Sequence, residues 1–340
     1  TSFQGTKLLN GNFSYTTSGV QSTQVNNLQI NSARIPDGAS INVVVQVTAS
    51  AKTGEITYSN GTLTSGVTIE VAGTAGTQQL SFASGTAVSS IATAINAITT
   101  ATGVSASVAA GSLKFDSTDY GSAAFVSVKT IAGTFDTDNN TTKSTGQDAA
   151  VTINGAAAEA SGLSVSYRSS DLDVQFDLNK SFNEPGTGSF EITGGGATFA
   201  LGSKVTETDK ASLGIQSVST GSLGNSTLGY LSSLASGGAS NLNSGNLVNA
   251  QKIVDLAVTQ VSQLRGRLGA FQKFTLGSTI NSLGVAFENA SAAESDIEDT
   301  DFAQETANLT RAQILSQSAT TVLAQANSAP SAALSLLRGG

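Results

Sequence analysis

Carboxylates are the side chains of this sequence with the widest chemical scope, because its 340 residues include no histidine and no cysteine. Without imidazole or thiol groups, the chain lacks the usual zinc ligands, the serine–histidine pair and the thiolate nucleophile. Carboxylate and lysine chemistry are what remain. The sequence therefore predicts no catalytic residue, no metal site and no cofactor, and a protein that is not an enzyme.

Two kinds of acidic motif have spacings that invite a chemical interpretation. Residues 136–139, Asp-Thr-Asp-Asn, resemble part of a calcium loop but lack its glycine and its terminal glutamate. The pairs Asp171/Asp173 and Asp116/Asp119 could act as glycosidase carboxylates, which need one acid in an apolar pocket and a partner across the sugar. The chain has no tryptophan and few other aromatic residues to form a sugar platform, so the sequence does not favour a glycosidase site. The missing glycine and glutamate likewise do not favour a calcium site.

An acidic run without an intervening Lys or Arg lies between Lys273 and Arg311 and consists of Glu288, Glu294, Asp296, Glu298, Asp299, Asp301 and Glu305. It could bind a cation or a basic protein face. A solvated loop between two helices explains it equally well, because Asp and Glu favour a helix N-terminus. The glycines 194–196 predict a tight turn and not a phosphate loop, since no Lys-Ser/Thr follows them.

The overall composition excludes several classes of partner. Charged residues make up only 12% of the chain and the net charge is −8, so its surface repels nucleic acid. No apolar run reaches the roughly 18 residues of a membrane span, and no signal peptide opens the sequence. The first residue is Thr1 and not Met, which we interpret as a fragment or a processed product.

The sequence predicts a first β-rich region over residues 36–130, which contains Asp116 and Asp119. Its predicted strands lie at 40–47, 67–71, 78–81, 104–108, 113–116 and 125–129. Val88, Ile91, Ile95 and Ile98 recur at helical spacing and predict one helix over 87–99, which ends before Gly103. Residues 130–147 are polar and glycine-containing, and predict an exposed loop or linker.

A second β-rich region is predicted over 148–220. Asn154-Gly155 indicates a hairpin turn after a strand at 151–153, with 163–167 as the return strand. Residues 172–178 alternate strictly between apolar and polar side chains, as a half-buried strand does. Residues 1–35 are too short to fold alone, and we predict that they return to pack on the helical core.

Residues 246–340 predict that helical core. Apolar residues step by three and four from Val254 to Phe271, and the rhythm resumes at Leu276 after a one-residue offset that resembles a coiled-coil stutter. A second helix is predicted to begin at Thr300 or Asp301, which can cap it. The fold class is therefore α+β, with long coiled-coil-like helices at the C-terminus and inserted β-rich outer domains.

Residues 292–315 and 322–327, followed by Pro330 and 334–338, resemble the C-terminal core of bacterial flagellins. The resemblance covers roughly residues 247–338. Residues 3–11 resemble the segment that follows the long N-terminal helix of that family, whose N-terminal helices are missing from this chain. Residues 76–128, which contain Ile95-Asn96, resemble the repeat of flagellins and hook-associated proteins that is named for its Ile-Asn pair.

The resemblance implies a structural subunit of the bacterial flagellar filament, exported without a cleaved signal peptide. Its partners would be other flagellin subunits, an export chaperone and the filament cap. The alternative is a cell-surface protein whose outer domains bind a host receptor or a glycan. The residues expected to pack helices and to polymerise are Val254, Val261, Leu264, Leu268, Phe271, Ile280, Leu283, Phe287, Phe302, Leu309, Ile314, Leu315, Val322, Leu323, Leu334 and Leu337.

Overall fold

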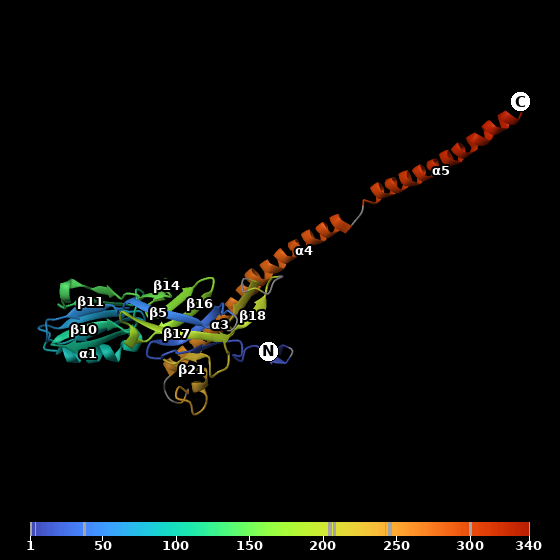
Figure 1. The fold of residues 1–340 in the computed structure, drawn as a ribbon. Coiled ribbons are helices and arrows are strands. Elements are labelled where there is room, and N and C mark those ends of the chain that lie inside the picture. Colours follow the sequence, from blue (N-terminus) through green and yellow to red (C-terminus); the bar gives the residue numbers. More distant parts are fainter. Residues whose placement is uncertain are drawn as a thin grey trace. The chain divides into compact units, whose positions relative to one another are not determined.

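The computed structural model describes residues 2–3, 5–36, 39–202, 206, 209–241, 243, 247–298 and 301–339. The chain forms two compact units, Thr1–Leu268 and Gly269–Gly340 (Figure 1). The first unit holds the strands and the second is helical. The predicted α+β class is therefore confirmed.

The described strands are β1 Ser2–Phe3, β2 Thr6–Lys7, β3 Tyr15–Ser18, β4 Val25–Ala33, β5 Ile41–Ala49, β6 Glu55–Tyr58, β7 Val67–Gly73, β8 Gly76–Phe82, β9 Val104–Ala109, β10 Ser112–Ser117, β11 Phe125–Ala132, β12 Lys143–Thr145, β13 Ala150–Ile153, β14 Ala156–Ser161, β15 Ser164–Arg168, β16 Leu172–Leu178, β17 Gly186–Gly195, β18 Ala197–Ala200, β19 Lys210–Leu213, β20 Gly224–Asn225 and β21 Gly229–Tyr230. The α-helices are α1 Val88–Ala97, α2 Thr99–Thr102, α3 Leu247–Ala270, α4 Gly277–Glu298 and α5 Phe302–Arg338. Short 3₁₀ turns occupy Asp138–Asn140, Lys180–Phe182 and Leu231–Leu234.

The largest sheet has eight antiparallel strands in the order β3-β17-β5-β13-β14-β15-β16-β4. Strand β16 shows how the sequence produces it. Leu172, Val174, Phe176 and Leu178 are buried in the core, whereas the residues between them carry the polar face. This is the alternation expected of a strand with one buried face, and it confirms the half-buried strand predicted over 172–178.

The pairing of this sheet differs from the predicted domain ranges. Strands β3 and β4 pair with β17 and β16, so residues 15–33 are part of the sheet and not a separate return segment. Strand β5, which we assigned to the 36–130 region, lies between β17 and β13. Local sequence patterns reveal a strand but not its partner, because the partner is set by burial across the whole sheet.

A second core is formed by the sheets β6-β10-β9 and β12-β11-β7-β8 together with α1. Ile91 and Ile95 of α1 are fully buried, as the helical spacing predicted. The side chain of Asn96 accepts from the backbone N–H of Ala106 and donates to the carbonyl of the same residue, both at 2.8 Å. The Ile-Asn pair thus combines a buried apolar anchor with a two-bond tie from α1 to β9.

Two predicted connections are wrong in detail. The return strand of the Asn154-Gly155 hairpin is β14 and not 163–167, because both turn residues have positive φ (+50° and +83°) and reverse the chain at once. Its alanines give β14 little strand signal. The predicted loop 130–147 contains β12 and the buried Phe135, whose ring stacks on Tyr58 at 4.1 Å.

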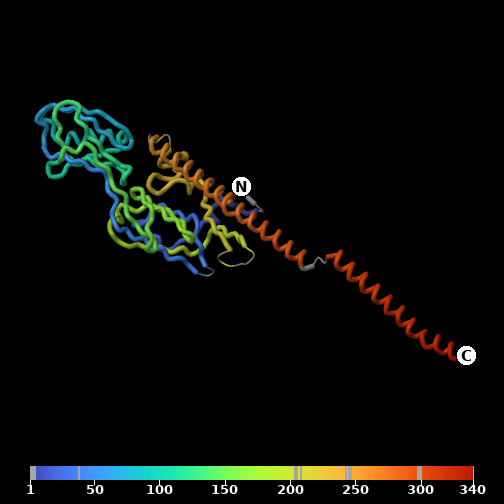
Figure 2. Tube along the Cα trace, turned by 90° about the horizontal axis from the view of Figure 1, so that it is seen from above, coloured from blue at the N-terminus to red at the C-terminus, as the bar shows by residue number. Residues whose placement is uncertain are grey.

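Asp148 ties together the segments that connect the two cores. The chain crosses from one core to the other and returns beside itself, with Lys52 and Gln147 paired at the crossing (Figure 2). The Asp148 carboxylate accepts from the Ser122 hydroxyl (2.5 Å), the Ser122 N–H (3.0 Å) and the Gly162 N–H (2.7 Å). These bonds hold the pKa of Asp148 below its ordinary value.

Replacing Asp148 by alanine is expected to lower the free energy of unfolding by about 1 kcal/mol at neutral pH, since water weakens hydrogen bonds to a partly exposed carboxylate. Because the pKa is lower in the folded chain, this stabilisation is complete above the ordinary value of 3.8 and is lost as the pH falls below it. Urea unfolding of both proteins at neutral and at acid pH measures the difference. A difference that stays the same at acid pH would contradict the assignment.

Candidate helical assembly surface

Helix α3 buries one face against its own chain. Ala250, Ile253, Ala257 and Leu264 are buried, and they are separated by three, four and seven residues, as one side of an α-helix requires. Ile253 lies next to Gly229, where an added Cβ would come within 3.3 Å of the Ile253 Cδ1 atom. Val254, which we expect to pack helices or to polymerise, is 42% exposed, whereas its neighbour Ile253 is 0% exposed.

Hydrogen bonds from polar side chains hold the same face of α3. The Gln260 amide accepts from the Gly224 N–H and donates to the Gly224 carbonyl, each at 2.8 Å. In the first turn of the helix, the Asn249 amide donates to the Leu228 carbonyl at 3.0 Å. Ala257 and Leu264 of this face belong to the predicted stripe. Ile253 and Gln260, which we missed, each lie one residue before a predicted member, Val254 and Val261, and have the same spacing of seven.

The one-residue offset in the apolar pattern coincides with a π-helical segment, Phe271–Leu276, between α3 and α4. A π-helical turn takes up one extra residue without interrupting the helix. The predicted irregularity is therefore confirmed, with a π-helical turn as its structural form.

Helix α4 carries an apolar face that no described residue covers. Ile280, Leu283 and Phe287 are three and four residues apart, so they lie on one side of the helix. All three are exposed, with Phe287 at 76%. Exposed large apolar side chains gathered on one helix face mark a surface that another chain or segment covers.

Helix α5 begins at the cap that the sequence predicted. The Asp301 carboxylate accepts from the N–H groups of Ala303 (3.1 Å) and Gln304 (3.2 Å). The helix then runs through Pro330 to Arg338, although proline leaves one backbone carbonyl without its helical partner. The neighbouring residues Asp299 and Thr300 lie outside the described residues.

The apolar residues of α5 surround the helix. At about 100° per residue, Leu309, Ile314 and Leu315 lie roughly 100–140° apart around its axis. Every described side chain of α5 is exposed, and Phe302 reaches 85%. A helix that is apolar on all sides is stable when it is covered on all sides.

The predicted packing residues therefore fall into three groups. Leu264 is buried, and Val261, Leu268 and Phe271 are half-buried. Val254 is exposed on α3. The others form the exposed apolar surface of α4 and α5, which we call the assembly surface: Ile280, Leu283, Phe287, Phe302, Leu309, Ile314, Leu315, Val322, Leu323, Leu334 and Leu337.

The acidic motifs form ordinary surface ion pairs and turns. Asp171 lies 3.3 Å from Arg34, and Asp173 lies 2.9 Å from Arg168. Asp138 accepts from the Ser59 hydroxyl at 2.7 Å. In the part of the chain that the structure describes, no group of three or more acidic residues is placed to hold a metal ion. None of the described helices is both long and apolar enough to cross a lipid bilayer.

Residues 251–337 match the model of the bacterial flagellin C-terminal helical region. This segment is therefore similar to the C-terminal region of flagellins. The flagellin of Salmonella muenchen is 47% identical over 97 residues, which are 28% of this chain and 19% of that protein. Flagellin C of Vibrio cholerae serotype O1 is 50% identical over 93 residues, or 27% of this chain and 24% of that protein. The predicted resemblance to flagellins is confirmed for this region.

The matched part spans about a fifth of the length of these flagellins. Among solved structures, the D2-D3 domains of the flagellar cap protein FliD from Serratia marcescens share 20% identity with this chain. The match covers 48% of this chain and 97% of that chain, with a TM-score of 0.31. So low a score supports no conclusion about the β-rich region, and the proposed Ile-Asn repeat stays a prediction.

Replacing Ile253 by alanine is expected to lower the free energy of unfolding of the first unit by about 2–4 kcal/mol, because it opens a cavity beneath α3. The neighbouring substitution Val254→Ala serves as the matched control and should cost less than about 0.5 kcal/mol, since that side chain is largely in water. Urea unfolding followed by hydrogen exchange of α3 measures both. Equal losses for the two variants would contradict the buried face described here.

Proposed function

We propose that this chain is a structural subunit of the bacterial flagellar filament. The observation that carries the proposal is the distribution of apolar residues in the flagellin C-terminal region. The residues of α5 that lie on different sides of the helix, such as Leu309, Ile314 and Leu315, are all exposed. Within a filament, neighbouring helices would cover each of these sides and bury the apolar area that is otherwise in contact with water.

The proposal also accounts for the two β-rich cores. Subunits polymerise through the helical region, so the two β-rich cores, each closed by its own sheets, would face outward without taking part in the seam. The protein would act outside the cell as part of the flagellum. By the family resemblance, it would be handled before assembly by an export chaperone and inserted beneath the filament cap.

The experiment places Leu309→Ser, Ile314→Ser and Leu315→Ser separately in the chromosomal gene of the bacterium that encodes the chain. Each substitution removes apolar contact on a different side of α5 and should cost about 2–5 kcal/mol per subunit if that side is buried. We expect each variant to shorten or abolish filaments, as seen by electron microscopy, and to reduce swimming.

Gln313→Ser is the matched control, because it alters a polar side chain between the test positions. An immunoblot of the culture medium separates failed assembly, in which the subunit is secreted, from failed export. Normal filaments and normal swimming in all three variants would mean that α5 is not buried in a filament, and the proposal would then be wrong.

A further inference from the structure

Strand β4 contains an irregularity where it runs beside β16. Asn26 pairs with Asp177 and Gln29 pairs with Gln175, so β4 has one more residue than its partner between these pairs. Asn27 lies in this bulge with φ of +52°, in the left-handed region that non-glycine residues rarely adopt. Bulges redirect side chains and recur beside functional sites.

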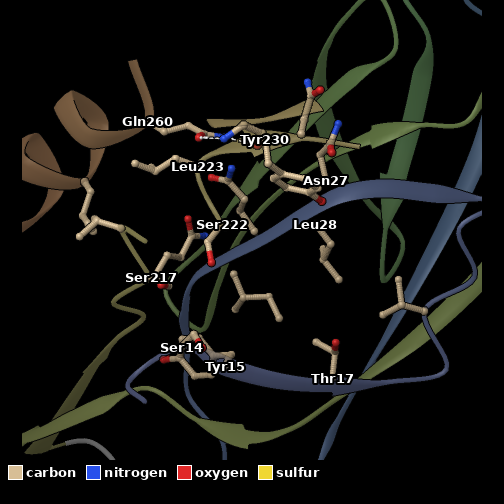
Figure 3. Close-up of a pocket in the computed structure, with 18 residues that line it drawn as sticks. Ser14, Tyr15, Thr17, Asn27, Leu28, Ser217, Ser222, Leu223, Tyr230 and Gln260 are labelled. Atoms are coloured by element: carbon tan, nitrogen blue, oxygen red, sulfur yellow. Dashed lines mark hydrogen bonds between the residues drawn. The ribbon is translucent and has the colours of Figure 1, made fainter. Parts of the chain in front are cut away.

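The bulge is one wall of a cavity of about 430 Å³ within the first unit (Figure 3). The cavity is lined by residues of β3, β4, the segment 216–230 and α3. Ile30 and Leu264, both buried, form an apolar part of the lining, and Leu28 points into the open space. This volume lies within the range of about 300–1,000 Å³ that is usual for small-molecule sites.

The polar walls of the cavity are held in place. The Asn27 amide donates to the Asp177 carboxylate at 2.7 Å and accepts from the Ser226 N–H at 3.3 Å. On the opposite wall, Gln260 holds Gly224 through the two hydrogen bonds described above, which Figure 3 shows as dashed lines. The cavity therefore has a shape that exists before any ligand arrives.

Other polar groups of the lining remain available to a ligand. The side-chain amides of Gln29 and Gln216 and the hydroxyl of Tyr230 make no hydrogen bond with any described residue, although both amides are half-buried. An amide can donate and accept at once, which suits a ligand whose groups also do both. Tyr230 is 40% exposed at the rim and offers a ring face as well as its hydroxyl.

The lining is electrically neutral, although the chain carries a net charge of −8. None of the eighteen lining residues is Asp, Glu, Lys or Arg. A phosphate, carboxylate or ammonium group would lose its hydration here without gaining a charged partner. A sugar ring loses less, because it presents hydroxyl groups at its edge and apolar C–H groups on its faces.

We propose that this cavity is a binding site for a neutral carbohydrate. The free amides of Gln29 and Gln216 bind the hydroxyl groups of the sugar, and the ring of Tyr230 covers one of its faces. The apolar lining formed by Leu28, Ile30 and Leu264 receives the C–H face. The site differs from the assembly surface of α4 and α5, so it can be tested without filament formation.

The test uses the complete 340-residue chain, with maltose, lactose and N-acetylglucosamine as neutral probes and glucuronate as a charged probe. Saturation-transfer NMR detects binding, and titration of the ¹⁵N-labelled chain gives the dissociation constant. We expect at least one neutral sugar to bind with a dissociation constant of about 1 mM, and glucuronate to bind more weakly. Gln29→Ala and Gln216→Ala should each raise the constant at least about tenfold, the loss of one well-placed polar partner.

Gln175→Ala is the matched control, because Gln175 faces Gln29 across the sheet but does not line the cavity. This substitution should leave the dissociation constant within about twofold of the value for the unsubstituted chain, since no contact to the ligand is lost. Tyr230→Phe should retain most of the binding and Tyr230→Ala should lose it, with circular dichroism to confirm that each variant is folded. The proposal is overturned if no neutral sugar binds at 20 mM, if glucuronate binds as tightly as the neutral sugars, or if Gln175→Ala weakens binding as much as Gln29→Ala.

Discussion

An α-helix with leucine and isoleucine on every side has no stable arrangement in water as an isolated rod, because each exposed apolar side chain costs free energy that only contact with other chains removes. Helix α5 is such a helix. In α4, by contrast, Ile280, Leu283 and Phe287 share one face, and α3 buries one face on its own chain. The apolar side chains left in contact with water therefore lie on more sides of the helix in α5 than in α3.

The burial of α3 depends on glycine in the segment beneath it. Gly224 has a φ of +117°, and a Cβ added there would lie 2.3 Å from the Gly229 carbonyl oxygen. Gly229 similarly leaves the space that Ile253 approaches. These two glycines bring β20 and β21 together closely enough for Gln260 and Ile253 to reach them. In this segment, Gly224 and Gly229 therefore serve close packing.

The β-rich part of the chain has no such need for partners. Each of its two cores is closed by its own sheets, and the large buried residues Phe176 and Phe115 lie one in each core. The connection between them is held by backbone pairing and by Asp148. The fold of this region therefore does not depend on covering the exposed apolar side chains of α4 and α5.

Much of the secondary structure followed from the sequence by itself. The three-and-four spacing of Ile91 and Ile95, the alternation over 172–178 and the cap at Asp301 depend on neighbours in the chain, and the structure has each of them. The similarity of residues 251–337 to the flagellin C-terminal region also needed no structure, because the matching residues are contiguous in the sequence. The one-residue offset before Leu276 could also be seen in the sequence, because it interrupts the three-and-four spacing of the apolar residues.

Only the tertiary structure decided which strands pair and which side of α3 is buried. Strand β4 lies beside β16, far from it in sequence, and the bulge at Asn27 exists only as a mismatch between these two strands. Ile253 and Val254 are adjacent, equally apolar and equally compatible with helical spacing, so the sequence alone does not choose between them. The choice depends on what lies opposite each side chain, and that is a property of long-range contacts, which spacing along the chain does not encode.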